Sequence, residues 1–553
     1  MPSLSTLCAV AGGFAIITAL TRRPLTAALM CMYLLAAILI SSTVMQSFLG
    51  MPLTLADVQF FFLDPLDDLQ LFINYPALGA SFLGIVGGAA TLLYFGIRRE
   101  RPRWPGPASP LNHSVRFALA AGVALMLGHG YVSAALPTHT GNVDDRDAYS
   151  AFLALRRLEL ADHWLERLNV FFDNRDMMAT LPAMHVQTRF PIAAGSETVE
   201  PSVAAASPLP DLMMVLEEST FDPQLIANCR YAPCRSAMFR APAGPWRTLQ
   251  SPMLVHTTGG GTWLTEFAFL SGFDWRSFGR GGAYAPVSLA PRLQISLPKY
   301  LRSLGYHTVV FSGVGADFLR ARSAYRYYGF DEFYASQDLK LSNDWHAVRD
   351  STIFNKTLQL LAASRDPRPL FVFILTIRNH GPHGTDKALL PPAVQKVEQQ
   401  LGKPLADYLA RLDDSARDME QLRRAWLGAP RPRVIGWFGD HQPEVAWDFL
   451  NTLADVDRTR FASNVGESQL RYLTYQQLSA NYGKPGASIS NEALDVPFLA
   501  AEFLDFAGVP TDAGMHAGDA VAAQCHRLLL DCADHALVDD YISYRVHDLQ
   551  SVR

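Results

Sequence analysis

The sequence predicts a helical membrane segment followed by an α/β domain whose mostly parallel central sheet is flanked by helices. Four long apolar stretches occur before residue 137, and short apolar runs alternate with polar helical stretches after residue 210. Of the 553 residues, 49% are hydrophobic and 18% charged, which excludes a disordered or collagen-like chain. The net charge of -5 gives no global basic field, so we expect no nucleic-acid partner.

The four apolar stretches predict the membrane segment. Each has about the 17–25 residues that a helix needs to cross a bilayer, and none contains Asp, Glu, Lys or Arg. They are Leu4–Leu20, Leu25–Leu49, Ala77–Ile97 and Phe117–Leu136. We therefore expect a transmembrane domain of about four helices over residues 1–137.

Basic residues predict the orientation of these helices. Arg22 and Arg23 lie in the first connection and five arginines flank the third, whereas the second connection, 50–76, has four aspartates and no basic residue. Because cytoplasmic loops are enriched in Lys and Arg, the chain after Leu136 is expected outside the cytoplasm. A cleaved signal peptide is the alternative, but the first three residues lack its basic start.

A connecting segment is expected over residues 138–210. Apolar residues near helical spacing predict an amphipathic helix over 145–174, which lies on the outer face of the bilayer or packs on the next domain. We favour the bilayer. Residues 192–210 are small, contain proline and show no periodicity, as is typical of a linker.

Residues 211–553 are predicted to form the α/β domain. Their short runs, rich in Val, Ile and Phe, are typical of buried strands in a parallel sheet, and helices are expected on both faces. The runs are Leu212–Leu216, Met253–His256, Thr308–Phe311, Leu370–Thr376, Val434–Phe438 and Val496–Leu499. Ligands of such sheets bind beyond the carboxyl ends of the strands, so residues that follow each run are candidate site residues.

Four of these strand ends carry reactive side chains. They are Glu217 and Glu218 after the first run, Thr262 after three glycines, His380 and His383 after a later run, and Asp440 with His441. Any one of them alone is more often a solvated or capping residue. Their occurrence at the exits of several predicted strands favours a common site.

The residue types indicate the chemistry of this site. Carboxylates with an imidazole suit a divalent cation such as Zn, Mn or Mg. Such a cation would acidify a hydroxyl placed beside it, and Thr262 is the candidate nucleophile. The glycines before Thr262 allow a tight turn, and the backbone amides that follow could hold an anion. The pattern predicts chemistry on a phosphate or sulfate group.

The cysteines indicate an oxidising compartment. Cys8 and Cys31 lie in the apolar stretches, whereas the other four form two close pairs, Cys229 with Cys234 and Cys525 with Cys532. Close pairs outside the cytoplasm are expected to be disulfides. The alternative for Cys229 and Cys234 is a pair of metal ligands, but no histidine lies near them at the spacing of a zinc finger.

Four motifs in order give a family resemblance. They are GluGluSerThr at 217–220, GlyGlyGlyThr at 259–262, AsnHisGlyPro at 379–382 and GlyAspHisGlnPro at 439–443. Behind several transmembrane helices, this set resembles the lipoteichoic acid synthase and periplasmic phosphoglycerol transferase family of the alkaline phosphatase and sulfatase superfamily. Residues 325–331 and 345–350 also match. The resemblance implies an alkaline-phosphatase-like domain over 211–553.

The resemblance also implies roles for residues. Glu218, Asp440, His441 and Thr262 match the metal ligands, Thr262 matches the nucleophile, and His380 matches a histidine that contacts the substrate phosphate. The implied metal is manganese, with magnesium and zinc as alternatives. Arg322 and Arg320 bracket the position of a phosphate-binding arginine, and Arg322 and His383 are taken as substrate-binding candidates. Ser219 and Thr220 are rival nucleophiles.

The resemblance implies a bacterial inner-membrane transferase with a periplasmic catalytic domain. It would move phosphoglycerol from phosphatidylglycerol, through a phospho-threonine, to a glycan or lipid-sugar acceptor. A phosphoethanolamine transferase using phosphatidylethanolamine and a phosphodiesterase are the alternative enzymes, and a non-catalytic interaction protein is a further class. Sulfate ester hydrolysis is disfavoured because Cys234 is not followed by the Pro and Arg of the formylglycine signature.

Overall fold

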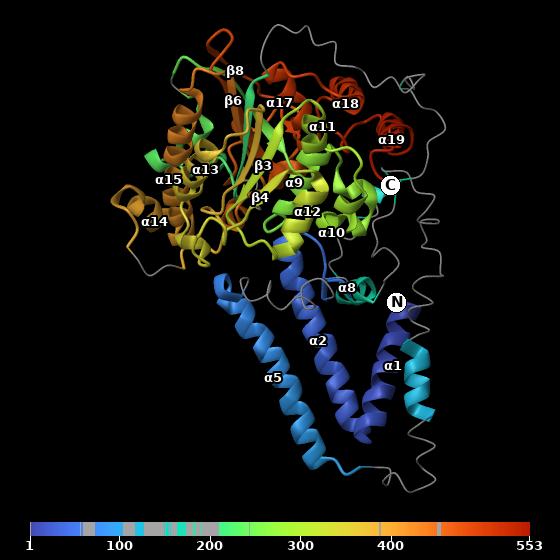
Figure 1. The fold of residues 1–553 in the computed structure, drawn as a ribbon. Coiled ribbons are helices and arrows are strands. Elements are labelled where there is room, and N and C mark those ends of the chain that lie inside the picture. The colour runs from blue at the N-terminus through green and yellow to red at the C-terminus, as the bar shows by residue number, and fades with distance from the viewer. Residues whose placement is uncertain are drawn as a thin grey trace. The chain divides into compact units, whose positions relative to one another are not determined.

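In a computed structural model of the protein, the chain forms two compact units (Figure 1). Met1–Asp145 and Leu153–Thr180 form the first unit, and Arg146–Phe152 and Leu181–Arg553 form the second. The structure describes residues 2–55, 57–58, 72–102, 117–126, 149, 151–153, 155, 163–172, 181–182, 190, 209–242, 244–385, 389–450 and 455–553.

In the described part of the N-terminal unit, three helices are long and apolar enough to cross a membrane: α1 (Leu4–Thr21), α2 (Pro24–Leu49) and α5 (Pro76–Arg99). Arg22 ends α1 in the left-handed conformation, and Pro24 begins α2 at a position where its missing N–H costs nothing. These helices confirm the prediction of an N-terminal membrane segment. The fourth predicted stretch is helical over Phe117–Met126, and its remainder lies outside the described residues.

The predicted amphipathic segment 145–174 is described in part, and it includes helix α8 (Trp164–Phe171). Leu168 and Phe171 of this helix are buried. The side-chain oxygen of Asn169 accepts hydrogen bonds from the Ser3 amide at 2.8 Å and the Thr6 hydroxyl at 2.9 Å. Helix α8 therefore packs on the start of α1 within its own unit. The predicted linker 192–210 lies outside the described residues except for its last two positions.

One nine-stranded sheet forms the centre of the C-terminal unit, in the order β4-β3-β5-β1-β6-β7-β2-β8, with β9 beside β2. All its pairings are parallel except those of β7 with β6 and β2. The prediction of a mostly parallel sheet is confirmed. The strands are β1 (Asp211–Glu217), β2 (Arg247–Leu254), β3 (His307–Ser312), β4 (Glu332–Tyr334), β5 (Leu370–Leu375), β6 (Arg433–Gly439), β7 (Leu473–Ala480), β8 (Gly486–Ile489) and β9 (Leu494–Asp495).

The sheet differs from the prediction in several places. Strands β4, β8 and β9 lie outside the predicted runs, and β2 begins six residues before the predicted run Met253–His256. The run Val496–Leu499 is not a strand: Pro497 starts a short 3-10 helix, and Leu499 begins a longer helix. Strand β7 is absent from the predicted set because its buried sequence is polar. Its glutamines are satisfied by specific partners, since Gln476 donates to the Ser251 hydroxyl at 3.0 Å and Gln477 to the Arg240 carbonyl at 3.1 Å.

Helices cover both faces of this sheet, as predicted. In Figure 1, α13 and α15 lie on one side and α9, α11 and α17 on the other. Strand β1 between them is completely buried, which places the core at the centre of the sheet. The helices are α9 (Thr262–Ser271), α10 (Ala285–Ser288), α11 (Leu297–Ser303), α12 (Ala321–Tyr328), α13 (Asp350–Ala363), α14 (Gln395–Leu401), α15 (Lys403–Leu427), α16 (Glu444–Leu450), α17 (Leu499–Ala507), α18 (Ala513–Gln524) and α19 (His535–Ser543).

The four cysteines of the C-terminal unit are paired. Cys229 is bonded to Cys234, and Cys525 to Cys532, while Cys8 and Cys31 of the apolar helices are free thiols. Each bond closes a short loop, since the paired cysteines are 5 and 7 positions apart in the sequence. We expect such short loops to add modestly to stability, because the entropy removed from the unfolded chain grows with loop length.

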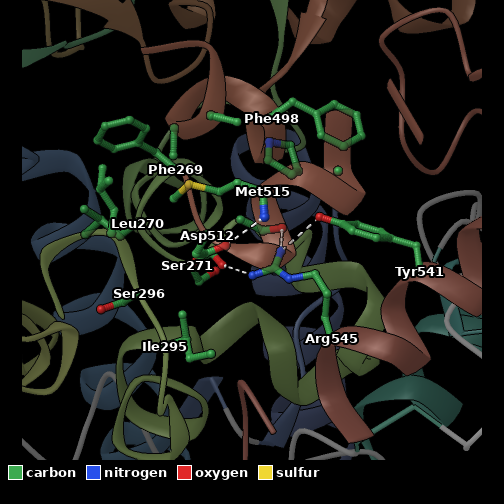
Figure 2. A pocket seen from close by; sticks show the side chains of 16 residues that line it. Phe269, Leu270, Ser271, Ile295, Ser296, Phe498, Asp512, Met515, Tyr541 and Arg545 are labelled. Carbon is green, nitrogen blue, oxygen red and sulfur yellow. Dashed lines mark hydrogen bonds between the residues drawn. The ribbon is translucent and has the colours of Figure 1, made fainter. Parts of the chain in front are cut away.

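Arg545 anchors the C-terminal end of α9, the helix that begins with Thr262. In the small cavity of Figure 2, its guanidinium points at the last turn of α9, donating to the Ser271 carbonyl at 2.7 Å and to the Gly272 carbonyl. The same group lies 3.9 Å from the ring centre of Phe273. A cation at this position satisfies carbonyls that lack intrahelical partners and opposes the negative end of the helix dipole.

We expect Arg545→Ala to lower the free energy of unfolding by about 3 kcal/mol, because it leaves buried carbonyls without donors and removes a packed side chain. Arg417→Ala is the matched control. Arg417 pairs with Asp413 and Asp414 at the surface, where such pairs contribute at most about 1 kcal/mol. Denaturant unfolding measures both, and equal losses would show that Arg545 has no anchoring role.

Candidate active site

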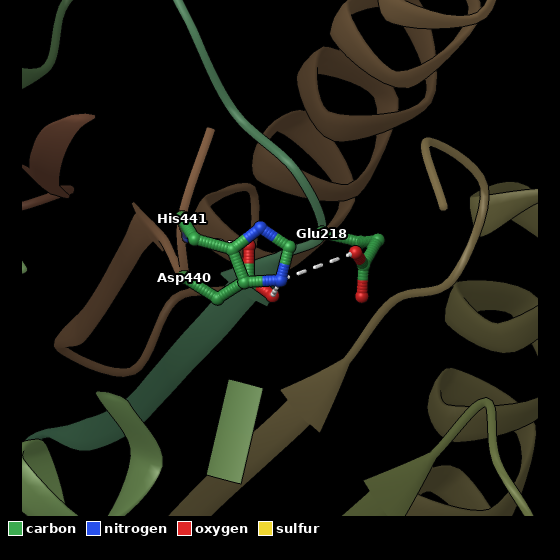
Figure 3. Close-up of side chains that lie close together, drawn as sticks. All are labelled: Glu218, Asp440 and His441. Carbon is green, nitrogen blue, oxygen red and sulfur yellow. Dashed lines mark hydrogen bonds and ion pairs between the residues drawn. The ribbon is translucent and has the colours of Figure 1, made fainter. Parts of the chain in front are cut away.

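Three of the predicted site residues meet where two neighbouring parallel strands end. Glu218 follows β1, and Asp440 and His441 follow β6. One ligand atom from each lies within 4.8 Å of the others, and all three side chains are buried. Figure 3 shows them facing one another, with His441 Nε2 3.1 Å from Asp440 Oδ2 and 3.8 Å from Glu218 Oε1.

Thr262 joins this cluster as the first residue of α9. Its hydroxyl donates to Asp440 Oδ2 at 2.7 Å, and its oxygen lies 3.5 Å from His441 Nε2. The preceding loop needs glycine at two positions. Gly260 has a φ of 85°, and a side chain on Gly261 would collide with the hydroxyl of Thr257. The glycines therefore allow the loop to bring Thr262 against the two strand ends.

Backbone contacts fix how His441 is presented. Its Nδ1 lies 3.0 Å from the Gln442 carbonyl and therefore carries the proton. Nε2 is then an acceptor that faces Thr262, and the Gly260 amide donates to it at 3.1 Å. An imidazole with Nε2 unprotonated is the form that binds metals.

The donor set fits a divalent cation. Two carboxylates, one neutral imidazole nitrogen and one hydroxyl converge in a buried space, and such oxygen and nitrogen ligands suit zinc or manganese. Burial and the nearby Asp440 carboxylate raise the pKa of Glu218 well above its usual range. Two buried carboxylates this close repel each other when both are ionised, and a cation between them would relieve that cost.

A buried charge network supports the loop that leads to Thr262. His256 stands just after β2 and bonds to Asp495 and Arg276, and Asp274 holds the Arg276 guanidinium at 2.7 Å. The His256 carbonyl also accepts from the Trp275 ring nitrogen at 3.0 Å. Because every charge in the network has a partner, it can hold the loop rigidly without leaving an uncompensated buried ion.

A pocket of about 710 Å³, including its open mouth, extends from the cluster along α9 and α12. Thr262, Glu218 and His380 share its lining. The Nδ1 of His380 donates to the Gly381 carbonyl at 2.9 Å, and its ring packs edge-on against Trp345. Burial lowers the pKa of His380 to about 4, so its imidazole is neutral at pH 7. A substrate at Thr262 would therefore meet His380 as a hydrogen-bonding group without charge.

Two predicted substrate residues lie elsewhere. Arg322 is 55% exposed, lies 3.2 Å from Asp338 and packs over Phe333, and it is not among the described residues that line the pocket. His383 is buried beside Tyr408, with Nε2 2.9 Å from the Asn379 carbonyl, and it does not line the pocket either. The structure thus offers neither side chain to a ligand at Thr262.

The pocket also contains polar residues that were not singled out from the sequence as site residues. Glu266, Tyr325 and Tyr328 line it, and the Tyr325 hydroxyl donates to Glu266 at 2.5 Å. Glu266 stands four residues after Thr262 on α9, and residues at this spacing share a helix face. That spacing is a signal in the sequence that could have identified Glu266.

The sulfatase family model matches residues 251–484, a segment that includes Thr262, His380 and the Asp440–His441 pair. An uncharacterized protein of Haemophilus influenzae is 28% identical over 359 residues, 62% of each chain. The Streptococcus pyogenes phosphoglycerol transferase GacH, solved with sn-glycerol-1-phosphate, superposes with a TM-score of 0.44 and 15% identity, over 61% of this chain and 85% of that one. The zinc complex of the C-terminal periplasmic domain of EptC from Escherichia coli superposes with a TM-score of 0.36 and 15% identity, over 56% of this chain and 85% of that one.

The family match covers part of the C-terminal domain. Residues 251–484 are similar to the sulfatase family, and the described residues that precede this domain include three apolar helices. The resemblance stated from the motifs is confirmed at this level. The aligned region spans 62% of the length of the Haemophilus influenzae relative, so the activity of the whole protein is a matter for proposal.

Proposed function

We propose that the protein is a membrane-anchored, metal-dependent transferase that moves the phospho-head-group of a membrane phospholipid to a sugar acceptor. The observation that carries this proposal is the Thr262 hydroxyl, 2.7 Å from Asp440 at the edge of a pocket and beside Glu218 and His441. Phosphoglycerol from phosphatidylglycerol is the group that the motif resemblance favours. The apolar helices would keep the domain near a donor that stays in the bilayer.

The proposed reaction has two displacements at phosphorus. Thr262 Oγ1 attacks the donor phosphodiester and passes its proton to Asp440 Oδ2, the bond from phosphorus to the diacylglycerol oxygen breaks, and that oxygen takes up a proton as it leaves. Asp440 Oδ2 orients the threonine by accepting its hydrogen bond, and the Gln442 carbonyl holds His441 in place by accepting from Nδ1. An acceptor hydroxyl then attacks the phospho-threonine and regenerates Thr262. His380 would steady the phosphoryl oxygens through a neutral hydrogen bond.

Glu218, Asp440, His441 and Thr262 would hold the cation. Manganese is the ion we propose, with magnesium and zinc as alternatives, and when bound it would acidify the threonine hydroxyl and neutralise charge on the phosphoryl group. We place the domain on the periplasmic side of a bacterial inner membrane. Paired cysteines and the arginine-rich first and third connections support this placement.

Phosphatidylethanolamine is the second candidate donor, and the charge of the pocket favours it. Among the described lining residues, the charged candidates are the carboxylates Glu218 and Glu266, and none is lysine or arginine. Glu218 would hold the cation, and the rest of the pocket, with Glu266, is suited to a head group that donates hydrogen bonds.

Transfer and hydrolysis can be separated by following the head group. The full chain in detergent, with head-group-labelled phosphatidylglycerol or phosphatidylethanolamine and a glycan acceptor, is expected to give labelled glycan that depends on the acceptor. A hydrolase would instead release free glycerol phosphate or ethanolamine phosphate at a rate that the glycan does not change. Mass spectrometry of both products measures the partition, and water as sole acceptor would contradict the proposed transferase.

A further inference from the structure

A polar cluster stands in the pocket one helical turn beyond Thr262. Glu266 is 8% exposed and follows Thr262 by four residues on the same face of α9, which corresponds to a backbone rise of about 6 Å along the helix axis. Tyr325 and Tyr328 approach from α12, 3% and 1% exposed. A group bound to a phosphate at Thr262 by two or three carbons would reach this cluster.

The cluster combines one carboxylate with two phenol hydroxyls, one of which donates to the carboxylate. The Tyr325 hydroxyl donates to Glu266 Oε2 at 2.5 Å, which leaves the phenol oxygen and the carboxylate available as acceptors. The Tyr328 hydroxyl is buried, lines the same pocket and has no hydrogen-bond partner in the described structure. A buried hydroxyl without a hydrogen-bond partner is uncommon in a packed protein interior, and it points to a ligand that supplies the partner.

We propose that Glu266, Tyr325 and Tyr328 form the head-group subsite, and that this subsite selects a donor whose head group ends in a primary ammonium. The inference rests on the proposed function. Of the two candidate donors it selects phosphatidylethanolamine, whereas the motif resemblance favours phosphatidylglycerol. An ammonium brings three N–H donors, matching one carboxylate and two phenol oxygens.

The residues around this cluster favour a head group with an ammonium over a glycerol head group. Trp263, Phe318 and Trp345 line the pocket with the two tyrosines, and aromatic faces attract an ammonium. Glycerol hydroxyls could be satisfied by neutral amides, whereas the chain buries a carboxylate here. That burial raises the pKa of Glu266 to about 8, and a bound ammonium would favour its ionised form.

Glu266→Gln tests the subsite with little change in shape, because the glutamine oxygen can still accept from Tyr325. With vesicles of labelled phosphatidylethanolamine, we expect head-group transfer by this variant to fall at least about tenfold, since a charge-assisted hydrogen bond is lost. Tyr328→Phe should lower the rate of head-group transfer roughly threefold without loss of stability, because the lost hydroxyl has no hydrogen-bond partner in the described structure. The rate with phosphatidylglycerol should change less in both variants.

Glu332→Gln is the matched control. Glu332 accepts from the Tyr334 hydroxyl at 2.6 Å on strand β4 and is not part of the pocket, so its change should leave transfer intact. The wild-type chain should prefer phosphatidylethanolamine to phosphatidylglycerol, and should reject phosphatidylcholine, whose ammonium has no N–H.

Each outcome has a distinct meaning. Preference for phosphatidylglycerol, or an equal loss with both lipids in Glu266→Gln, would overturn the ammonium subsite while leaving the transferase proposal in place. Absence of any labelled Thr262 peptide with either lipid would overturn the transferase proposal itself, and the subsite with it.

Discussion

Thr262→Ala is expected to abolish head-group release from labelled phospholipid, with a loss of roughly a thousandfold or more. The variant removes the proposed nucleophile, and without that oxygen the proposed covalent intermediate cannot form. Thr262→Ser should retain a measurable rate because it keeps the hydroxyl beside Asp440. The assay is the release of labelled diacylglycerol by the full chain, and protein mass spectrometry should find the head-group adduct on the Thr262 peptide.

The rival hydroxyls provide the control for this experiment. Ser219 Oγ donates to Glu218 Oε1 at 2.6 Å, and Thr220 Oγ1 to the Glu217 carbonyl at 2.7 Å, so both are engaged as donors inside the protein. Ser219→Ala should slow the reaction by disturbing Glu218 but still yield an adduct on Thr262. An adduct on Ser219, or full activity of Thr262→Ala, would assign the nucleophile to another residue.

The convergence of Glu218, Asp440 and Thr262 could be predicted from the sequence because these candidate residues follow strands. In a parallel sheet the carboxyl ends meet at one edge, so Glu218 after β1 and Asp440 after β6 had to become neighbours once those strands paired. Thr262 comes from β2, two strands away from β6, and a helix start directed by the glycine loop brings it to the same cluster. Polar residues at strand exits were therefore an informative signal.

Other features depended on tertiary context that local patterns do not record. Strand β7 lacks apolar alternation because its buried glutamines bond to neighbouring strands and loops, and the run at Val496 is apolar because it packs as a helix start. Arg322 sits one residue beyond a motif position, and on a helix one residue rotates a side chain by about 100°. It faces Asp338 at the surface instead of the pocket.

Asp440→Asn is expected to remove metal binding and transfer together while leaving the fold intact. Asp440 Oδ1 accepts from the amides of Ser219 and His441, both at 2.7 Å, and an asparagine oxygen can keep these two bonds. The substituted amide nitrogen would then replace Oδ2, where it could neither accept from the Thr262 hydroxyl nor coordinate a cation. The variant thus keeps the hydrogen bonds of Oδ1, which support the fold, and removes Oδ2, which faces Thr262.

Chelation of the wild-type chain should have the same effect on activity, reversibly. Added manganese should restore transfer and raise the stability of the wild type by about 2.7 kcal/mol at a hundred times its dissociation constant, since a ligand of the native state stabilises it by mass action. Asp440→Asn should show no such rise, whereas Asp413→Asn, an exposed carboxylate paired with Arg417, should respond like the wild type. Thermal unfolding with and without metal, together with metal content per chain, measures the difference. Full transfer in chelator with an unchanged midpoint would mean that the buried carboxylates share a proton and hold no cation, and the acidity of Thr262 would then need another source.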